Sequence, residues 1–210
     1  DTLWAVSEYF CGTNVEDYAP YNFEHITTLL SAITDLNLDA TGGKVFVDPV
    51  TGIDENDSGL SEESPFKSIN FALSRVFGTT DYPVTIQLAA DAIIDNENET
   101  FPIIMVENIH IVGNNTTIDG TGTNGRVIVF ENAINSRIEG VTIKGGNTND
   151  SFELGGAGIY VKYGRPILKD VIIENNISHY FGAGISLNYN VDIVLDNVII
   201  RNNTGSGILG

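Results

Sequence analysis

One loop of the sequence concentrates side chains that can bind a metal ion. Between residues 48 and 63 the chain is polar and acidic and contains no lysine or arginine. Asp48, Asp54 and Asp57 supply the hard oxygen ligands that Ca²⁺ prefers, although the loop lacks the distal glutamate of an EF-hand. Aspartate-rich turns also form local hydrogen bonds with their own backbone. The sequence therefore predicts either no cofactor or a calcium ion held by these three aspartates.

Aromatic side chains gather in the last quarter of the chain, at expected loops and outward positions. They are Tyr160, Tyr163, Tyr180, Phe181 and Tyr189. Aromatic faces stack on other flat partners, including sugar rings, and they also pack against each other or a neighbouring chain. This cluster is predicted to bind carbohydrate or to form an interface.

Some charged residues have the types needed to cleave a polysaccharide. A lyase needs a base such as Lys144, Lys169 or Arg201 beside bound Ca²⁺, and a hydrolase needs carboxylates about 5–10 Å apart. Lys144 and Arg201, however, occupy positions that charge alternation between repeats already explains. No catalytic residue is predicted, and the enzyme interpretation is kept as an alternative.

Composition excludes several classes of protein. The 210 residues carry 28 acidic and 10 basic side chains, a net charge of −18, so a nucleic-acid backbone is not an expected partner. No apolar run approaches the ~20 residues of a membrane span. Cys11 is the single cysteine and can form no internal disulfide.

Two segments are predicted to be helical. Apolar residues recur at helical spacing over 23–36, inside an aromatic N-terminal region of residues 1–43. A second helix is expected over 64–77, with Ser64 as its N-cap and Pro65 at its first position. This second helix is expected to cap the strands that follow.

From Val84 onward the chain is rich in short β-strand patterns and contains an internal repeat. Segments 138–146, 168–176 and 195–203 align without gaps, at spacings of 30 and 27 residues. A second series follows at 156–161, 182–187 and 205–209. Two interleaved series of this period describe a solenoid in which stacked turns create the core.

Alternation along the repeats assigns their side chains to two sides. The expected inward positions are Val141, Ile143, Val171, Ile173, Val198 and Ile200, with Ile138, Leu168 and Leu195 one corner earlier. The expected outward charge ladders are Lys144, Glu174 and Arg201, and Glu139, Lys169 and Asp196. Asn175 and Asn202 are expected to stack at a corner and to hydrogen-bond along the stack.

These motifs resemble the right-handed parallel β-helix, or pectin-lyase-like, superfamily. The resemblance covers roughly Lys44 to the end and rests on Val-Ile-Ile-x-Asn-Asn, on the Gly-x-Gly-Ile strands, and on 47–59 followed by Ser64-Pro-Phe-Lys-Ser-Ile69. It implies an all-β, right-handed parallel β-helix with an N-terminal helical cap, at an extracellular or cell-surface location. The superfamily includes lyases, hydrolases, adhesins, tailspikes and non-catalytic surface proteins.

Three regions are predicted: an aromatic and helical segment at 1–43, a β-helix entry motif at 44–83, and solenoid turns at 84–210. The sequence stops inside a repeat strand, which a longer chain or another subunit could cover. Outward Ile172 and Ile199, with Ile208 and Leu209, form an expected assembly stripe.

The expected function is that of a secreted, non-enzymatic surface or structural protein that associates with itself and binds carbohydrate. The alternative is the N-terminal part of a polysaccharide lyase or glycoside hydrolase that acts on acidic glycans.

Overall fold

The computed structural model describes residues 43–148, 155–179, 182–189, 191–205 and 208–209. The helix predicted at 23–36 lies outside these residues, as do Tyr180 and Phe181. Contacts divide the chain into two units, Asp1–Leu38 and Asp39–Gly210, and all the described residues belong to the second.

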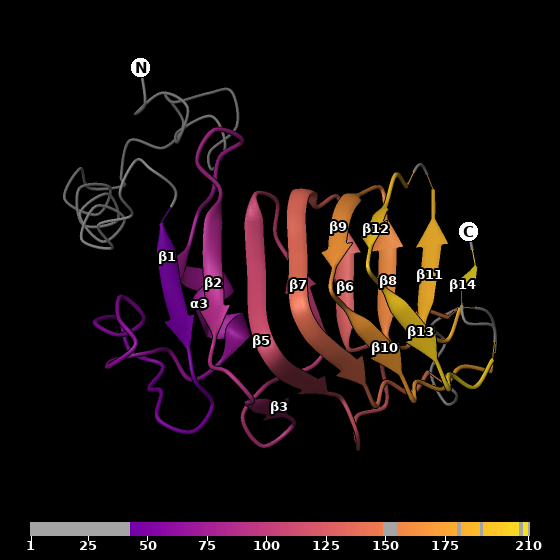
Figure 1. Cartoon of the computed structure of the whole chain (residues 1–210), viewed down its shortest axis with the longest axis horizontal. Coiled ribbons are helices and arrows are strands. Elements are labelled where there is room, and N and C mark those ends of the chain that lie inside the picture. The colour runs from indigo at the N-terminus through magenta and orange to yellow at the C-terminus, as the bar shows by residue number, and fades with distance from the viewer. Residues whose placement is uncertain (1–42, 149–154, 180–181, 190, 206–207, 210) are drawn as a thin grey trace, which may run out of the picture. The chain divides into compact units, whose positions relative to one another are not determined.

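The second unit is a parallel β-solenoid of about four turns, and its strands lie side by side in Figure 1. The elements are β1 (Lys44–Val47), α3 (Ile69–Arg75), β2 (Val84–Leu88), β3 (Ile93–Asp95), β4 (Ile103–Met105), β5 (Ile109–Asp119), β6 (Ile128–Glu131), β7 (Ile134–Lys144), β8 (Ile159–Lys162), β9 (Arg165–Lys169), β10 (Ile172–Glu174), β11 (Ile185–Asn188), β12 (Val194–Asp196), β13 (Ile199–Arg201) and β14 (Ile208–Leu209). The fold class expected from the repeats is confirmed.

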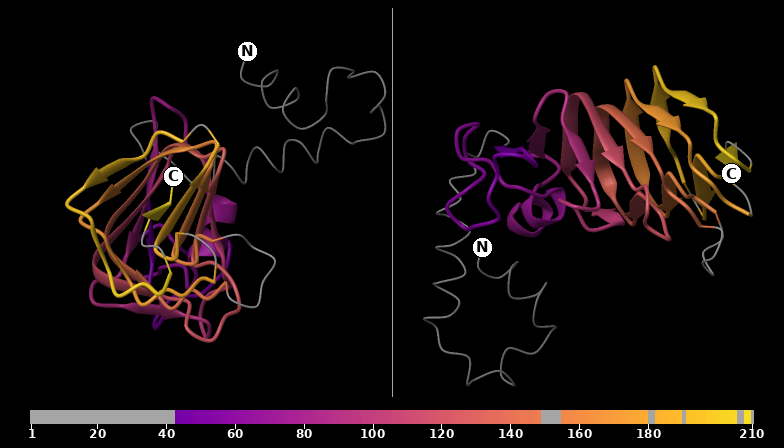
Figure 2. Two further views of the ribbon diagram at one scale, coloured as in Figure 1. Left: turned by 90° about the vertical axis from the view of Figure 1, so that its right-hand side faces the viewer. Right: turned by 90° about the horizontal axis from the view of Figure 1, so that it is seen from below.

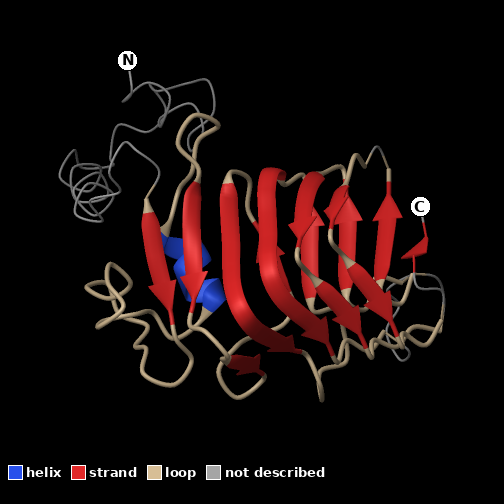
Figure 3. Ribbon diagram, in the orientation of Figure 1, coloured by secondary structure: helices blue, strands red, loops and turns tan. Residues whose placement is uncertain are grey.

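From β2 onward each turn has three strand faces, and all the pairings between named strands are parallel. A nine-stranded sheet runs β1-β2-β5-β7-β10-β13, with β3 on β5, β9 on β7 and β12 on β9. The long strands β5 and β7 serve two faces, because their pairing shifts register between Val112 and Thr116. A five-stranded sheet, β14-β11-β8-β6-β4, closes the third side. Figure 2 shows the successive turns along the stack, and Figure 3 shows how strongly strands dominate.

Stacked aliphatic side chains fill the interior. Ile94, Ile118, Ile143 and Ile173 occupy one register position on successive turns, and each is fully buried. The predicted inward residues are buried up to residue 173. The last turn differs, because Leu195 is 43% exposed whereas its partner Leu168 is fully buried. Among the described residues, a neighbouring turn covers Leu195 on one side only.

The asparagine stack lies one residue later than predicted. Asn175 and Asn202 have left-handed backbones, with φ of 55° and 54°, and their side chains are exposed. The adjacent Asn176 turns inward and donates from Nδ2 to Oδ1 of Asn203, 3.0 Å away. The left-handed corner therefore points the first asparagine of each pair to solvent and the second into the solenoid.

The prediction of the second helix was wrong at its start. Residues 64–66 are extended rather than helical: the backbone N–H of Phe66 donates to Phe46, and Phe66 bridges Val47 in parallel. Helix α3 begins at Ile69, and its N-cap is Ser68, whose side chain accepts from the N–H of Phe71. The extended segment satisfies backbone groups along β1 and protects this sheet edge from other strands.

Candidate functional site

The most exposed aromatic pair of the described chain lies where β8 and β11 end. Lys162 and Asn188 are in register as the last residues of these strands, so the following Tyr163 and Tyr189 are neighbours on adjacent turns. Their rings stack with centroids 5.3 Å apart and an interplanar angle of 23°. Tyr163 is 42% exposed and Tyr189 66%. We call this pair the tyrosine ledge.

Both tyrosines occupy a backbone conformation that disfavours bulky residues. Their φ angles are 52° and 57°, in the left-handed region. Asn132, which follows β6 one turn earlier, has a φ of 56° there and is a residue type that tolerates it better. Such outliers concentrate at functional sites. The fold thus holds two large aromatic rings at corners where asparagine would be less strained.

A cation and a carboxylate border the ledge. The Nζ of Lys162 lies 5.5 Å from the Tyr163 ring centroid and 2.7 Å from Oε1 of Glu131. The hydrogen bond to Glu131 holds the pKa of Lys162 above its ordinary value. The ledge therefore combines a flat apolar surface with polar groups that can accept or donate hydrogen bonds.

Tyr160 does not join the ledge. It lies on the outer face of β8, in register with Val129 and Ser186, and the guanidinium carbon of Arg126 sits 3.9 Å from its ring centroid. One face of this ring is therefore occupied by a cation. Of the three predicted aromatic residues that the structure describes, Tyr163 and Tyr189 come together and Tyr160 does not join them.

The acidic loop uses its carboxylates within the fold. Asp48 accepts hydrogen bonds from the backbone of Val50 and from the hydroxyl of Thr51. Partial burial acts to raise the pKa of Asp48, but these hydrogen bonds outweigh it and hold the pKa below its ordinary value. Asp54 fixes Ser68, the N-cap residue of α3, by accepting from its backbone N–H and its hydroxyl.

No group of three or more His, Cys, Asp or Glu side chains in the described residues is arranged to hold a metal ion. Asp48, Asp54 and Asp57 are therefore not brought together into such a cluster, and calcium stays a prediction from the sequence.

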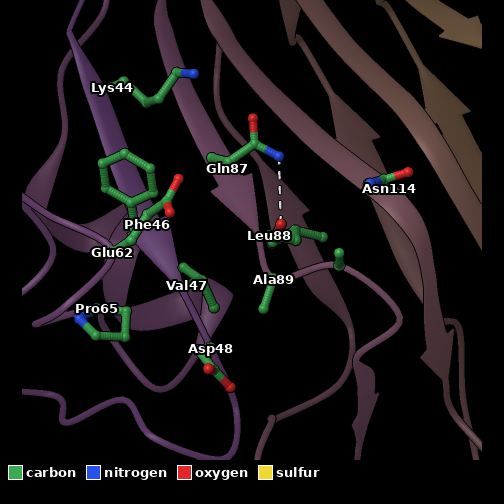
Figure 4. A pocket seen from close by; sticks show the side chains of 11 residues that line it. Lys44, Phe46, Val47, Asp48, Glu62, Pro65, Gln87, Leu88, Ala89 and Asn114 are labelled. Atoms are coloured by element: carbon green, nitrogen blue, oxygen red, sulfur yellow. Dashed lines mark hydrogen bonds between the residues drawn. The ribbon is translucent and has the colours of Figure 1, made fainter.

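A groove of about 400 Å³ opens on the outer face of β1 and β2. Phe46, Gln87 and Asn114 line it, together with Lys44 and Glu62 (Figure 4). The amide of Gln87 donates to the carbonyls of Leu88 and Val112 and so is fixed to the sheet. No sequence motif marks this surface, because its residues come together only through the pairing of β1 with β2 and of β2 with β5.

The residues weighed for catalysis form ion pairs along the solenoid. Lys144 Nζ lies 3.0 Å from Asp119, and Arg201 Nε lies 2.7 Å from Glu174. Burial acts to raise the pKa of Asp119, but hydrogen bonds from Thr121 and Lys144 outweigh it and lower the pKa. The predicted ladders thus have the expected register, and their charges alternate in sign.

The expected assembly stripe has the predicted register on one face. Ile172 pairs with Thr142 on one side and with Ile199 on the other. Ile199 is 46% exposed, and Ile172 is partly exposed. Ile208 and Leu209 belong to β14 on the five-stranded sheet, so they do not continue this row.

These observations define a parallel β-solenoid that carries an exposed tyrosine ledge. Residues 50–209 match the family described as "Protein of unknown function (DUF1565)", and the chain belongs to this family, which is associated with β-helix proteins. Searches of the curated proteins and of the solved structures return no significant match. None of the helices in the described residues has the length and apolar character to cross a membrane.

Proposed function

We propose that the protein is a secreted or cell-surface, non-enzymatic β-solenoid that binds carbohydrate through the tyrosine ledge. The observation that carries the proposal is the stacked, exposed pair Tyr163 and Tyr189, held at strained corners. Rigid aromatic rings give a large contact area at small entropic cost. The bordering Glu131 and Lys162 supply polar contacts for sugar hydroxyls.

The ledge is tested by the double variant Tyr163→Asn/Tyr189→Asn, measured on a glycan array and then by calorimetry with the best glycan. Asparagine is chosen because Asn132 occupies the equivalent corner, so the fold should be kept. We expect the variant to weaken binding at least about tenfold, as expected for the loss of two central aromatic contacts.

Tyr82→Ala is the matched control, because Tyr82 is 50% exposed and lies away from the ledge, before β2. Its glycan affinity should stay within about twofold of the unmodified protein. An unmodified protein that binds no glycan on the array, or a double variant that binds as well as it does, would contradict the proposal. Release of shortened products from an acidic glycan would favour the alternative of a lyase or hydrolase.

Self-association through the stripe is a second proposed property, supported by the exposure and register of Ile172 and Ile199. The variant Ile172→Thr/Ile199→Thr copies Thr142 of the same row. If the stripe is an interface, sedimentation velocity should show dimers or larger species for the unmodified protein at about 100 μM, and monomers for the variant. Identical sedimentation of the two proteins would exclude the stripe as the interface.

A further inference from the structure

One outer row of the solenoid departs from the charge pattern of the others. Lys44, Thr85, His110 and Arg137 are successive register partners on β1, β2, β5 and β7, which lie side by side in Figure 1. The row therefore holds three basic side chains and a hydroxyl about 4.8 Å apart from rung to rung. It contains no carboxylate, in a protein whose net charge is −18. We call it the basic row.

A second charged row begins with two carboxylates, Asp95 and Asp119, and alternates in sign only from Asp119 onward. Asp119, Lys144, Glu174 and Arg201 follow one another in register, and ion pairs of 3.0 and 2.7 Å join them two by two. Alternation removes the repulsion between like charges on neighbouring strands. The basic row contains no carboxylate of its own, and its one ion pair joins Arg137 to Glu139 of the neighbouring row, so a negatively charged ligand would add compensation at the other rungs.

Arg137 is held in place but keeps hydrogen-bonding capacity. Its Nε lies 3.4 Å from Oε2 of Glu139, and this nitrogen is buried without a hydrogen-bond acceptor. The other oxygen of Glu139 is occupied by Lys169, at 2.8 Å. A guanidinium has five N–H donors in a fixed plane. Glu139 is shared between Arg137 and Lys169, so most of the Arg137 donors stay available to a ligand.

His110 completes the row beside Arg137. It is half-buried between the rungs of Thr85 and Arg137. Burial, and then the charge of Arg137, lower the pKa of His110, while a hydrogen bond to the backbone of Asn135 and the charge of Glu139 act in the opposite direction. Burial is thus the main reason that the charged imidazole is disfavoured, and the neighbouring Arg137 adds to it.

We propose that the basic row binds a tetrahedral oxyanion, either free sulfate or phosphate or the sulfate or phosphate group of a larger ligand, over Thr85, His110 and Arg137, with Lys44 at the end of the row. Such an anion presents oxygens on several sides and can accept hydrogen bonds from neighbouring rungs at once. The hydroxyl of Thr85, an imidazole N–H of His110 and the guanidinium of Arg137 are donors that suit this chemistry, and protonation of His110 adds a positive charge. This site is separate from the tyrosine ledge and stands or falls independently of it.

The proposal is tested by titrating inorganic sulfate into the protein at constant ionic strength, balanced with chloride, while the imidazole resonances are followed by NMR. The His110 resonance is assigned as the one that is missing from the spectrum of the His110→Gln variant. We expect a saturable shift of the His110 signal, and an affinity that falls at least about tenfold in Arg137→Gln. Arg201→Gln removes the same charge from an alternating row and should change the affinity less than about twofold.

Sulfate remains a dianion across the pH range of histidine titration, so pH separates the role of His110. Affinity should rise as the pH falls below 6.5, the ordinary histidine pKa, because the pKa of His110 is lower than this value, and His110→Gln should remove the rise. Absence of a saturable shift, or an equal loss in Arg137→Gln and Arg201→Gln, would overturn the proposal. A parallel titration with a hexose sulfate ester identifies the source, because tighter binding of the ester than of free sulfate marks a sugar-borne group.

Discussion

Replacing Asn176 by alanine should lower the free energy of unfolding by about 3 kcal/mol. The Asn176 side chain is fully buried between turns. Its Oδ1 accepts from the N–H of Gly146, and its Nδ2 donates to the carbonyls of Ile143 and Glu174 and to Oδ1 of Asn203. Alanine would leave the buried N–H of Gly146 without this acceptor and would remove the donor to the three oxygens, and a buried unsatisfied polar group costs about 1–3 kcal/mol before relaxation. Urea unfolding followed by circular dichroism measures the loss.

Two further variants give the Asn176 prediction its controls. Asn114→Ala removes an exposed amide whose side chain lies on the outer face, and it should change stability by less than about 0.5 kcal/mol. Asn176→Asp keeps the shape but replaces the donating amide by a buried carboxylate. It should destabilise more than alanine at neutral pH and less in acid, where the carboxyl is protonated. A loss below about 1 kcal/mol in Asn176→Ala would show that water replaces the amide.

The repeat made the solenoid and its inner face predictable from the sequence. Period-two alternation put Ile143 and Ile173 inside and Lys144 and Glu174 outside, and stacking of equivalent positions leaves little freedom in that assignment. Predictions from local motifs were weaker. Ser64 and Pro65 have the residue types of a helix start, but pairing of Phe66 with β1 keeps this segment extended. Tertiary pairing overrides a local capping preference of about 1 kcal/mol.

The candidate sites depend on features that residue types alone do not reveal. Adjacent asparagines at 175 and 176 are chemically identical, and only the left-handed corner decides which of them turns inward. The tyrosines at 163 and 189 were recognisable as aromatic residues near the repeats. Their stacking, however, follows from the pairing of β8 with β11, in which the last residues of the two strands are in register. The residues of the basic row lie before the segments of the gap-free repeat. The register between β5 and β7 also shifts further along these strands, so the repeat spacing could not predict which residues are neighbours in the row.

Glu99 is a second residue whose removal should have a large effect, and no sequence motif marked it. The carboxylate is 7% exposed and joins the turn before β4 to the start of α3. Its Oε2 accepts from the backbone N–H groups of Ile69 and Asn70, at 2.6 and 3.3 Å, and its Oε1 accepts from Thr100 N and Asn70 Nδ2. Glu99→Ala would leave these donors without their acceptor, and we expect a loss of about 3 kcal/mol in urea unfolding.

Glu97→Ala is the matched control for Glu99, because Glu97 is exposed two residues earlier and should change stability by less than about 0.5 kcal/mol. The loss of stability in Glu99→Gln should lie between those of Glu97→Ala and Glu99→Ala. Glutamine keeps the size and one accepting oxygen, but it turns an NH₂ group toward backbone donors. A Glu99→Ala protein as stable as Glu97→Ala would mean that α3 is held to the solenoid by its apolar contacts alone.

The pH dependence of stability tests whether burial or hydrogen bonding dominates at the Glu99 carboxylate. Burial raises the pKa of Glu99 above its ordinary value of 4.5, and the four hydrogen bonds to its carboxylate reduce this rise without cancelling it. A raised folded-state pKa means that folding takes up a proton, so the contribution to stability is full below pH 4.5 and is lost as pH rises through the folded pKa. The stability of the unmodified protein relative to Glu99→Gln should therefore increase on acidification toward pH 4.5. A relative stability that decreases instead would show that the N–H donors outweigh burial, and that α3 is anchored by a stabilised charge.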